Sequence, residues 1–115
     1  MIQAIHRYKA RFFQALAHPV RIRILELLRD GPRSVGELQS LLTVEGSNVS
    51  QQLAVLRKEH IVENTKEGTT VIYQVVDPLV FQILDVSRQM FQHQLSQMIS
   101  AMAEDPDRGD DKPVG

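Results

Sequence analysis

The sequence predicts a mostly α-helical fold that contains one small β-hairpin, an α+β domain. Two observations lead to this prediction. Hydrophobic residues recur at spacings of three and four in several segments, which is typical of helices that bury one face. A single later segment has β-branched residues on both sides of a glycine, which is typical of a hairpin. With 115 residues, of which 43% are hydrophobic, the chain is expected to form one domain at residues 1–103, followed by a tail at 104–115.

Two helices are expected in the first 30 residues. The first should cover residues 2–17, where apolar residues repeat at spacings of three, four and four: Ile5, Tyr8, Phe12 and Leu16. The dipeptide His18-Pro19 interrupts this pattern. Proline suits the first position of a new helix, where its missing N–H costs nothing, so the second helix should run from Pro19 to about Arg29. We expect His18 to be a capping or packing residue.

A helix-turn-helix is expected next. Ser34 and Glu37 have the spacing of a capping box, in which each side chain bonds to the backbone N–H of the other residue. They predict a short helix over residues 34–42. Residues 44–46 should form the turn, and Ser47 should cap a further helix at residues 47–58. Two helices joined by a tight turn are the arrangement of helix-turn-helix proteins.

The helix at 47–58 has two different faces. Val49, Leu53 and Leu56 line up as an apolar stripe. The remaining positions carry amide, hydroxyl and basic groups, which can pair with base edges and phosphates in a DNA major groove. These candidate DNA-binding residues are Ser47, Asn48, Ser50, Gln51, Gln52 and Arg57. The alternative is a polar surface helix with no partner, although such a face more often carries Glu and Lys.

A hairpin follows this helix. Residues 61–64 and 70–75 are rich in β-branched side chains, and residues 66–69 between them include Gly68. We call the helix at 47–58 the expected recognition helix, and a hairpin placed directly after such a helix is a wing. Its tip, with Lys66, Thr69 and Thr70, could reach the phosphate backbone or the minor groove. The alternative is a hairpin that only covers the core.

A long last helix completes the domain. Asp77 and Pro78 suit a cap and a first helical position, and the helix should run to about Ala103. Its apolar residues form two neighbouring stripes, which together are broader than one small domain can cover. We therefore expect homodimerisation through the first and last helices, rather than packing within one protomer. The expected interface contains Ile5, Tyr8, Phe12, Leu84, Phe91, Leu95, Met98 and Met102.

The charge distribution permits a nucleic-acid partner. The net charge is −1, but residues 1–36 carry seven basic and two acidic residues, a local charge of +5. Residues 104–115 carry five acidic and two basic residues, which leaves the remainder of the chain at +2. We expect this acidic tail to be disordered. A mildly basic body predicts few phosphate contacts and moderate salt dependence.

The sequence gives little indication of a metal site or a catalytic site. Cysteine is absent, and no two of the four histidines have the spacing that joins ligands on one helix. No catalytic grouping stands out, so we expect no enzyme activity, no cofactor and no metal site, apart from an open question about a site across the dimer from His6 and His93. No apolar run approaches the ~18 residues of a membrane span, and we expect a cytoplasmic protein.

The order of these elements and four local strings resemble the ArsR/SmtB family of bacterial winged helix-turn-helix repressors. The strings are FFQALAHPVRIRILELL (12–28), SVGELQSLL (34–42), SNVSQQLAVLRKEHIV (47–62) and EGTTVIYQV (67–75). The resemblance implies a homodimer that binds an inverted repeat in a promoter and releases it when an inducer binds. By position, it implies that four polar residues face the major groove: Asn48, Ser50, Gln51 and Gln52. It also implies that Arg57 and the wing residues Lys66, Thr69 and Thr70 meet the backbone.

The chain departs from the metal-sensing members of that family. Residues 37–41, where some members carry thiolates, read ELQSL. Asp85 is followed two residues later by Ser87, and His93 three residues later by Ser96, so a second known ligand pattern is also missing. The inducer is therefore left open. We expect a sequence-specific DNA-binding repressor; the alternative is a winged-helix dimer that binds a protein without reading DNA, which the balanced charge of residues 47–76 slightly favours.

Overall fold

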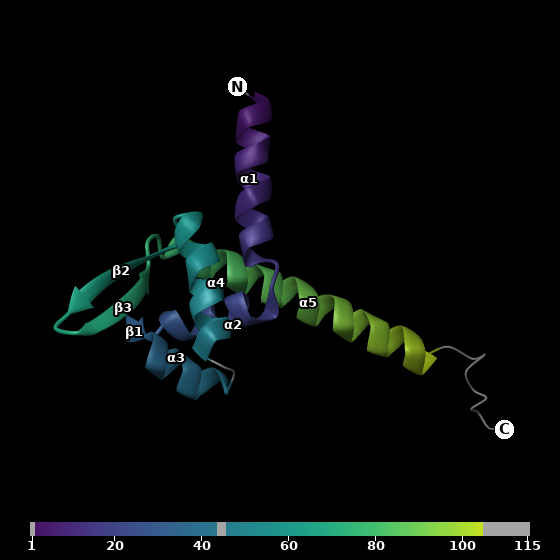
Figure 1. Cartoon of the computed structure of the whole chain (residues 1–115). Helices are drawn as coiled ribbons and strands as arrows, with labels where there is room; N and C mark the ends of the chain where they lie inside the picture. The colour runs from purple at the N-terminus through teal and green to yellow at the C-terminus, as the bar shows by residue number, and fades with distance from the viewer. Residues whose placement is uncertain (1, 44–45, 105–115) are drawn as a thin grey trace. The chain divides into compact units, whose positions relative to one another are not determined.

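The computed structural model describes residues 2–43 and 46–104. It divides into two units, one up to Phe81 and one from Gln82 onward, so that the boundary falls near the start of the last helix. Apart from the short strand β1, the elements follow the order that the sequence predicts, and the mostly helical fold with one small sheet is confirmed (Figure 1). They are α1 (Ile2–Leu16), α2 (Pro19–Leu28), β1 (Arg33–Ser34), α3 (Val35–Leu42), α4 (Gly46–Lys58), β2 (Val62–Glu67), β3 (Thr70–Val75) and α5 (Leu79–Glu104).

Helix α2 is capped at both ends by side chains. At the start, His18 has an extended backbone, and its Nδ1 accepts a hydrogen bond from the Val20 N–H at 3.1 Å. The expected capping role of His18 is thus confirmed. At the end, Arg33 Nε donates at 3.0 Å to the Leu27 carbonyl, one of the last carbonyls of the helix, which also accepts from the Asp30 N–H at 3.4 Å.

The capping box at α3 is also confirmed. Ser34 Oγ accepts from the Glu37 N–H at 3.1 Å, and the Glu37 carboxylate accepts from the Ser34 N–H at 2.9 Å. Strand β1 was not predicted. Its two residues are too few to show an alternating pattern, and they form a strand only because they pair with β3, Arg33 opposite Tyr73 and Ser34 opposite Ile72.

The three strands form an antiparallel sheet in the order β1-β3-β2. The hairpin register runs from Val62 opposite Val75 to Glu67 opposite Thr70. Strand β2 therefore continues three residues beyond the predicted end at Asn64, and the turn shrinks to two residues. Gly68 in this turn has a φ of 65°, a left-handed conformation that glycine adopts without steric cost.

The first unit has a wholly apolar core. Every described residue that is fully buried is hydrophobic. Helices α2, α3 and α4 each contribute side chains with no exposed surface, and β2 and the first turn of α5 add Val62 and Val80. Arg29 contacts the first turn of α5 in two ways. Its Nη2 donates to the Phe81 carbonyl at 2.9 Å, and its guanidinium lies 5.2 Å from the Phe81 ring centre.

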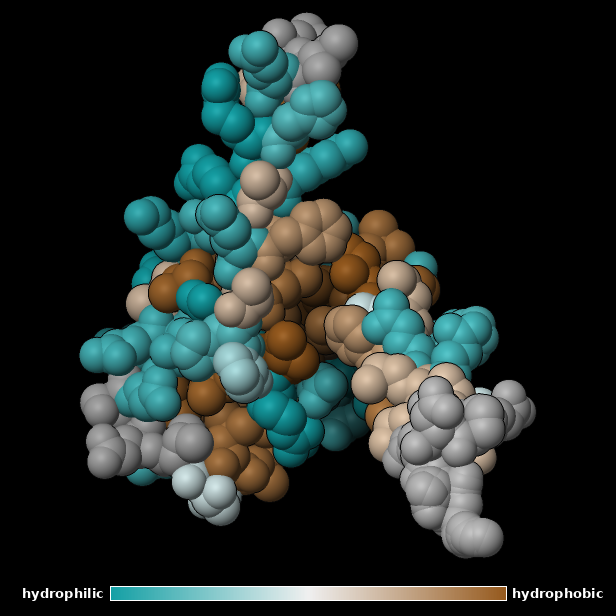
Figure 2. Space-filling model, turned by 90° about the vertical axis from the view of Figure 1, so that its right-hand side faces the viewer, coloured by the Kyte–Doolittle hydropathy of each residue, from teal (hydrophilic) through white to brown (hydrophobic). Residues whose placement is uncertain are grey.

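Helix α5 begins with the predicted acidic cap, because Asp77 Oδ1 accepts from the Leu79 N–H at 2.9 Å. Its large hydrophobic residues from Val86 onward are between 51% and 64% exposed. Such exposed side chains appear as brown and tan surface among the teal in Figure 2. None of the described helices is long and apolar enough to cross a membrane. The predicted tail was expected to start at Glu104, but Glu104 is the last residue of α5. The predicted turn residues 44 and 45 and the rest of the tail, 105–115, lie outside the described residues.

Candidate nucleic-acid interface

Helix α4 presents its polar face to solvent because its apolar face is fully buried. Val49, Leu53 and Leu56 have no exposed surface, as the predicted stripe requires. On the other side of the helix, Ser50 and Gln51 are exposed. The three buried side chains fix the orientation of α4 in the domain. The polar face is therefore held in one position, as binding in a DNA groove requires.

Two of the candidate base-reading residues are bonded to one another. Gln52 Nε2 donates to Asn48 Oδ1 at 3.0 Å across one helical turn, and both side chains are half-buried. This bond fixes the orientation of the two amides and leaves part of the bonding capacity of each free. Ser50 and Gln51, in contrast, have no side-chain partner among the described residues.

Helix α4 begins at Gly46, one residue earlier than predicted. Ser47 is therefore a first-turn residue rather than the cap, and the expectation that it caps the helix is wrong. The residue before Gly46 lies outside the described part of the chain. At the other end, Arg57 and Lys58 occupy the last turn, where positive charge is favoured by the helix dipole.

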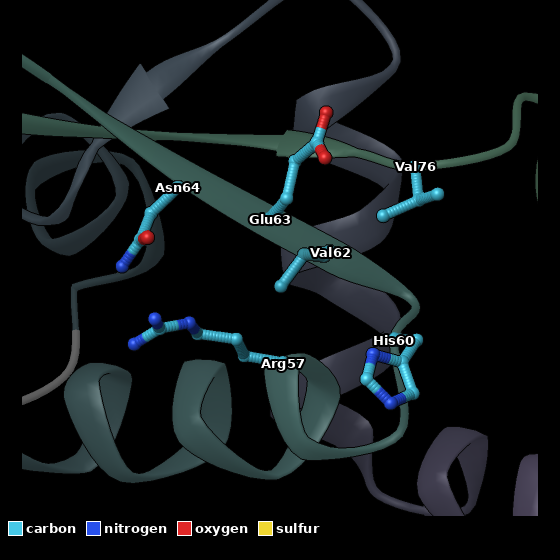
Figure 3. A pocket seen from close by; sticks show the side chains of 6 residues that line it. All are labelled: Arg57, His60, Val62, Glu63, Asn64 and Val76. Carbon is cyan, nitrogen blue, oxygen red and sulfur yellow. The ribbon is translucent and has the colours of Figure 1, made fainter.

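The wing separates its charges onto two faces. Lys66, Thr69 and Thr70 are all exposed at the hairpin tip. Alternate residues of a strand share a face, so Lys66 lies on the face of Val62 and Asn64. Figure 3 shows both of those side chains on the side of α4, whereas Glu63 points away from it. By the same alternation, Glu67 shares the face of Glu63, away from Lys66.

Two acidic residues near this surface are bonded to other side chains, one of them a cation. Glu59 Oε2 pairs with Arg11 Nη2 of α1 at 3.2 Å. Glu63 Oε2 accepts a hydrogen bond from Gln74 Nε2 at 2.9 Å on the outer face of the hairpin. The zero net charge of residues 47–76 therefore understates how basic the α4 side is, because one of the three acids is matched from outside that range. This weakens the charge argument for a protein-only partner.

A pocket of about 430 Å³ lies between the end of α4 and β2. It is lined by Arg57, His60, Val62, Glu63, Asn64 and Val76 (Figure 3). Neither His60 nor Asn64 was expected at a functional site from the sequence. The alternation from Val62 to Asn64 would have placed Asn64 on the inner face, but only the packing of α4 against β2 brings it to Arg57. Among the described residues, no group of three His, Cys, Asp or Glu side chains could hold a metal ion.

Comparison with known proteins identifies the family. A family model described as "Bacterial regulatory protein, arsR family" matches residues 18–64, which span α2 to β2. The chain is also 42% identical over 103 residues to the HTH-type transcriptional regulator Rv0081 of Mycobacterium tuberculosis, a match that covers 89% of this chain and 90% of the relative. The chain belongs to the ArsR family of bacterial regulatory proteins. It is a winged helix-turn-helix transcriptional regulator, and the predicted family is confirmed.

Solved structures agree with this assignment. The crystal structure of Rv0081 matches with a TM-score of 0.75 at 45% identity, over 83% of this chain and 96% of that one. The homodimeric winged helix-turn-helix DNA-binding domain Mb0332 of Mycobacterium bovis matches with a TM-score of 0.74 at 26% identity, over 83% and 88%. A biofilm growth-associated repressor of Agrobacterium fabrum is 32% identical over 82 residues, 71% of this chain and 70% of the relative.

Proposed function

We propose that this ArsR-family protein is a homodimeric repressor that binds an inverted-repeat operator in double-stranded DNA. The observation that carries the proposal is the polar face of α4, which is exposed, free of acidic residues from Asn48 to Lys58, and anchored by three buried side chains. The name of the Agrobacterium relative supports repression. A repressor of this kind would block a promoter by occupying it, and would act in the bacterial cytoplasm.

The proposed dimer uses the exposed apolar side chains of α1 and α5. Tyr8 is 68% exposed and Phe91 64% exposed, and a row of such residues on a helix rarely stays open to water. The homodimeric state of Mb0332 supports a second copy of the chain as the partner. The proposed interface is Ile5, Tyr8, Phe12, Leu84, Phe91, Leu95, Met98 and Met102.

The proposed DNA contacts divide into base reading and backbone positioning. Ser47, Asn48, Ser50, Gln51 and Gln52 would enter the major groove, where Asn and Gln amides pair bidentately with adenine at roughly 1–3 kcal/mol of discrimination for each good pair. Arg57, Lys66, Thr69 and Thr70 would meet phosphates. The two recognition helices of a dimer would then occupy half-sites about 34–36 Å apart.

The test is selection of bound sequences from random DNA, with the parent protein, Gln51→Ala and Gln39→Ala. Gln51 is exposed on the proposed reading face, and Gln39 is an exposed glutamine on α3. The parent should select a two-fold symmetric site. Gln51→Ala should still dimerise but lose preference at one or two positions in each half-site, while Gln39→Ala should select the parental site. Unchanged base preference in Gln51→Ala would remove the assignment of Gln51, and failure of the parent to enrich any sequence would remove the function.

A further inference from the structure

The pocket between α4 and β2 has a basic side chain from the recognition helix and an amide from the wing at one end. Figure 3 shows the Arg57 side chain running along α4 beneath β2, with its guanidinium below the Asn64 amide. His60 lies at the other end of the pocket, where α4 passes into β2. Two separate elements thus aim hydrogen-bond donors into one space.

Neither donor is used within the described part of the chain. The Arg57 guanidinium and the Asn64 amide make no hydrogen bond or ion pair with another described residue. The one carboxylate of the lining residues, Glu63, points to the outer face of the hairpin and accepts from Gln74 at 2.9 Å. An arginine beside a pocket with no acid directed into it is suited to an anionic ligand, because guanidinium binds oxyanions through its fork of N–H donors.

The position of Arg57 also connects the pocket to the proposed reading face. Arg57 lies three residues after Ala54 and seven after Ser50, so the three share one side of α4, and all three are exposed. Asn64 shares its strand face with Lys66 at the wing tip. A ligand in this end of the pocket would therefore adjoin both surfaces that we propose to meet DNA.

We propose that Arg57 and Asn64 form a phosphate site that bridges the recognition helix and the wing. Its ligand is a phosphoryl group, either of the DNA backbone beside the half-site or of a small phosphorylated molecule that would compete with DNA. The DNA form of this proposal rests on the proposed function. Asn64 is the residue that this proposal adds. With it, the phosphoryl group would be bound from both α4 and β2, instead of by a single arginine on α4.

The first experiment measures DNA affinity against salt concentration for two pocket variants and two matched controls. The pocket variants are Arg57→Gln and Asn64→Ala. Lys58→Gln removes a neighbouring cation of the same turn that does not line the pocket, and Thr65→Ala changes the adjacent, exposed residue on the other face of β2. All are measured on the selected operator and on an unrelated duplex of equal length.

Arg57→Gln should weaken binding to both duplexes about tenfold per protomer, and should reduce the slope of log K against log salt by about 0.9 for the phosphate it releases. Asn64→Ala should weaken both about three- to tenfold with an unchanged slope, because it removes a neutral donor. Lys58→Gln should change the slope by less than half as much as Arg57→Gln, since a cation that touches no phosphate acts only through a screened field. Thr65→Ala should match the parent.

The second experiment follows the Arg57 Nε–H and Asn64 side-chain amide resonances of the full chain during titration with inorganic phosphate, with chloride at matched ionic strength as the reference. If the pocket variants weaken DNA binding as described, the backbone is the ligand. If they bind DNA like their controls but phosphate shifts both resonances of the parent, a small phosphorylated molecule is the ligand. If neither result is obtained, the proposal is overturned.

These two experiments also separate the inference from the function on which it rests. A parent protein that binds no DNA would refute the proposed function, and the phosphate titration alone would then decide about the pocket. A parent that binds a symmetric operator, with Arg57→Gln equal to Lys58→Gln, Asn64→Ala equal to Thr65→Ala, and no phosphate shift, would refute the pocket and leave the function standing.

Discussion

Replacing His60 by glycine should stabilise the protein. His60 has a φ of 60°, a left-handed conformation that is unusual for a residue with a Cβ atom. It follows α4 in a Schellman-type ending, in which the His60 N–H donates to the Arg57 carbonyl at 3.0 Å and the Ile61 N–H donates to the Leu56 carbonyl at 2.9 Å. This helix ending normally carries glycine at the position of His60.

The size of the effect follows from two opposing contributions to the free energy of unfolding. The left-handed conformation costs an L-residue roughly 1–2 kcal/mol, which glycine avoids. Glycine itself lowers the free energy of unfolding by roughly 0.5–1 kcal/mol, because a chain with glycine has more conformations to lose when it folds. The imidazole is exposed and has no hydrogen-bond partner among the described residues, so little else is lost. The net gain should lie between roughly 0 and 1.5 kcal/mol, centred near 0.75 kcal/mol.

Urea unfolding at a fixed protomer concentration measures this gain, because the stability of a dimer depends on concentration. Lys58→Gly is the matched control. It places glycine two residues earlier, in the regular last turn of α4, and should cost up to about 1 kcal/mol. Opposite signs for the two substitutions are the expected result. A His60→Gly protein that is less stable than the parent would show that the imidazole makes a stabilising contact, and the backbone argument would be wrong.

Three further substitutions test other parts of the structure. Ser34→Ala removes one half of the capping box of α3 and should lower the free energy of unfolding by about 1 kcal/mol in urea titrations; an unchanged midpoint would contradict the bonded geometry. Leu53→Ala opens a cavity beneath the polar face of α4 and should cost roughly 2–5 kcal/mol by the same measurement, whereas a loss below 1 kcal/mol would mean that the site is loosely packed. Leu95→Glu should convert the dimer to a monomer in light scattering, while the adjacent exposed Ser96→Glu should remain dimeric; two dimers would argue against the α5 interface.

The helices could be predicted because their signals are local. His18, Ser34 and Asp77 each bond to a backbone N–H two or three residues away, so the spacing of a capping residue is visible in the printed sequence. The stripe of Val49, Leu53 and Leu56 likewise follows from helical periodicity. The error at Ser47 is of the same local kind, since several residues before α4 could serve as its start and helix ends are the least certain part of such a prediction.

Features that join residues far apart in the chain were not predicted from the sequence. Strand β1 exists only through its pairing with β3, some forty residues later. The Arg11–Glu59 pair, which changes the charge balance beside α4, joins α1 to the residue after α4. Neither has a sequence pattern, because a two-residue strand has no period and charged residues are common on any surface.

The order of residues was sufficient for the helical framework, the wing and the polar character of the recognition helix, since hydrophobic spacing and capping act over a few residues. Three features depend on how α1, α4 and the sheet pack together: the pocket that Arg57 and Asn64 share, the pairing of Glu59 with Arg11, and the third strand. Packing depends on the whole core, because side chains from several helices and strands fill one space together. It therefore cannot be predicted from any short segment of the sequence.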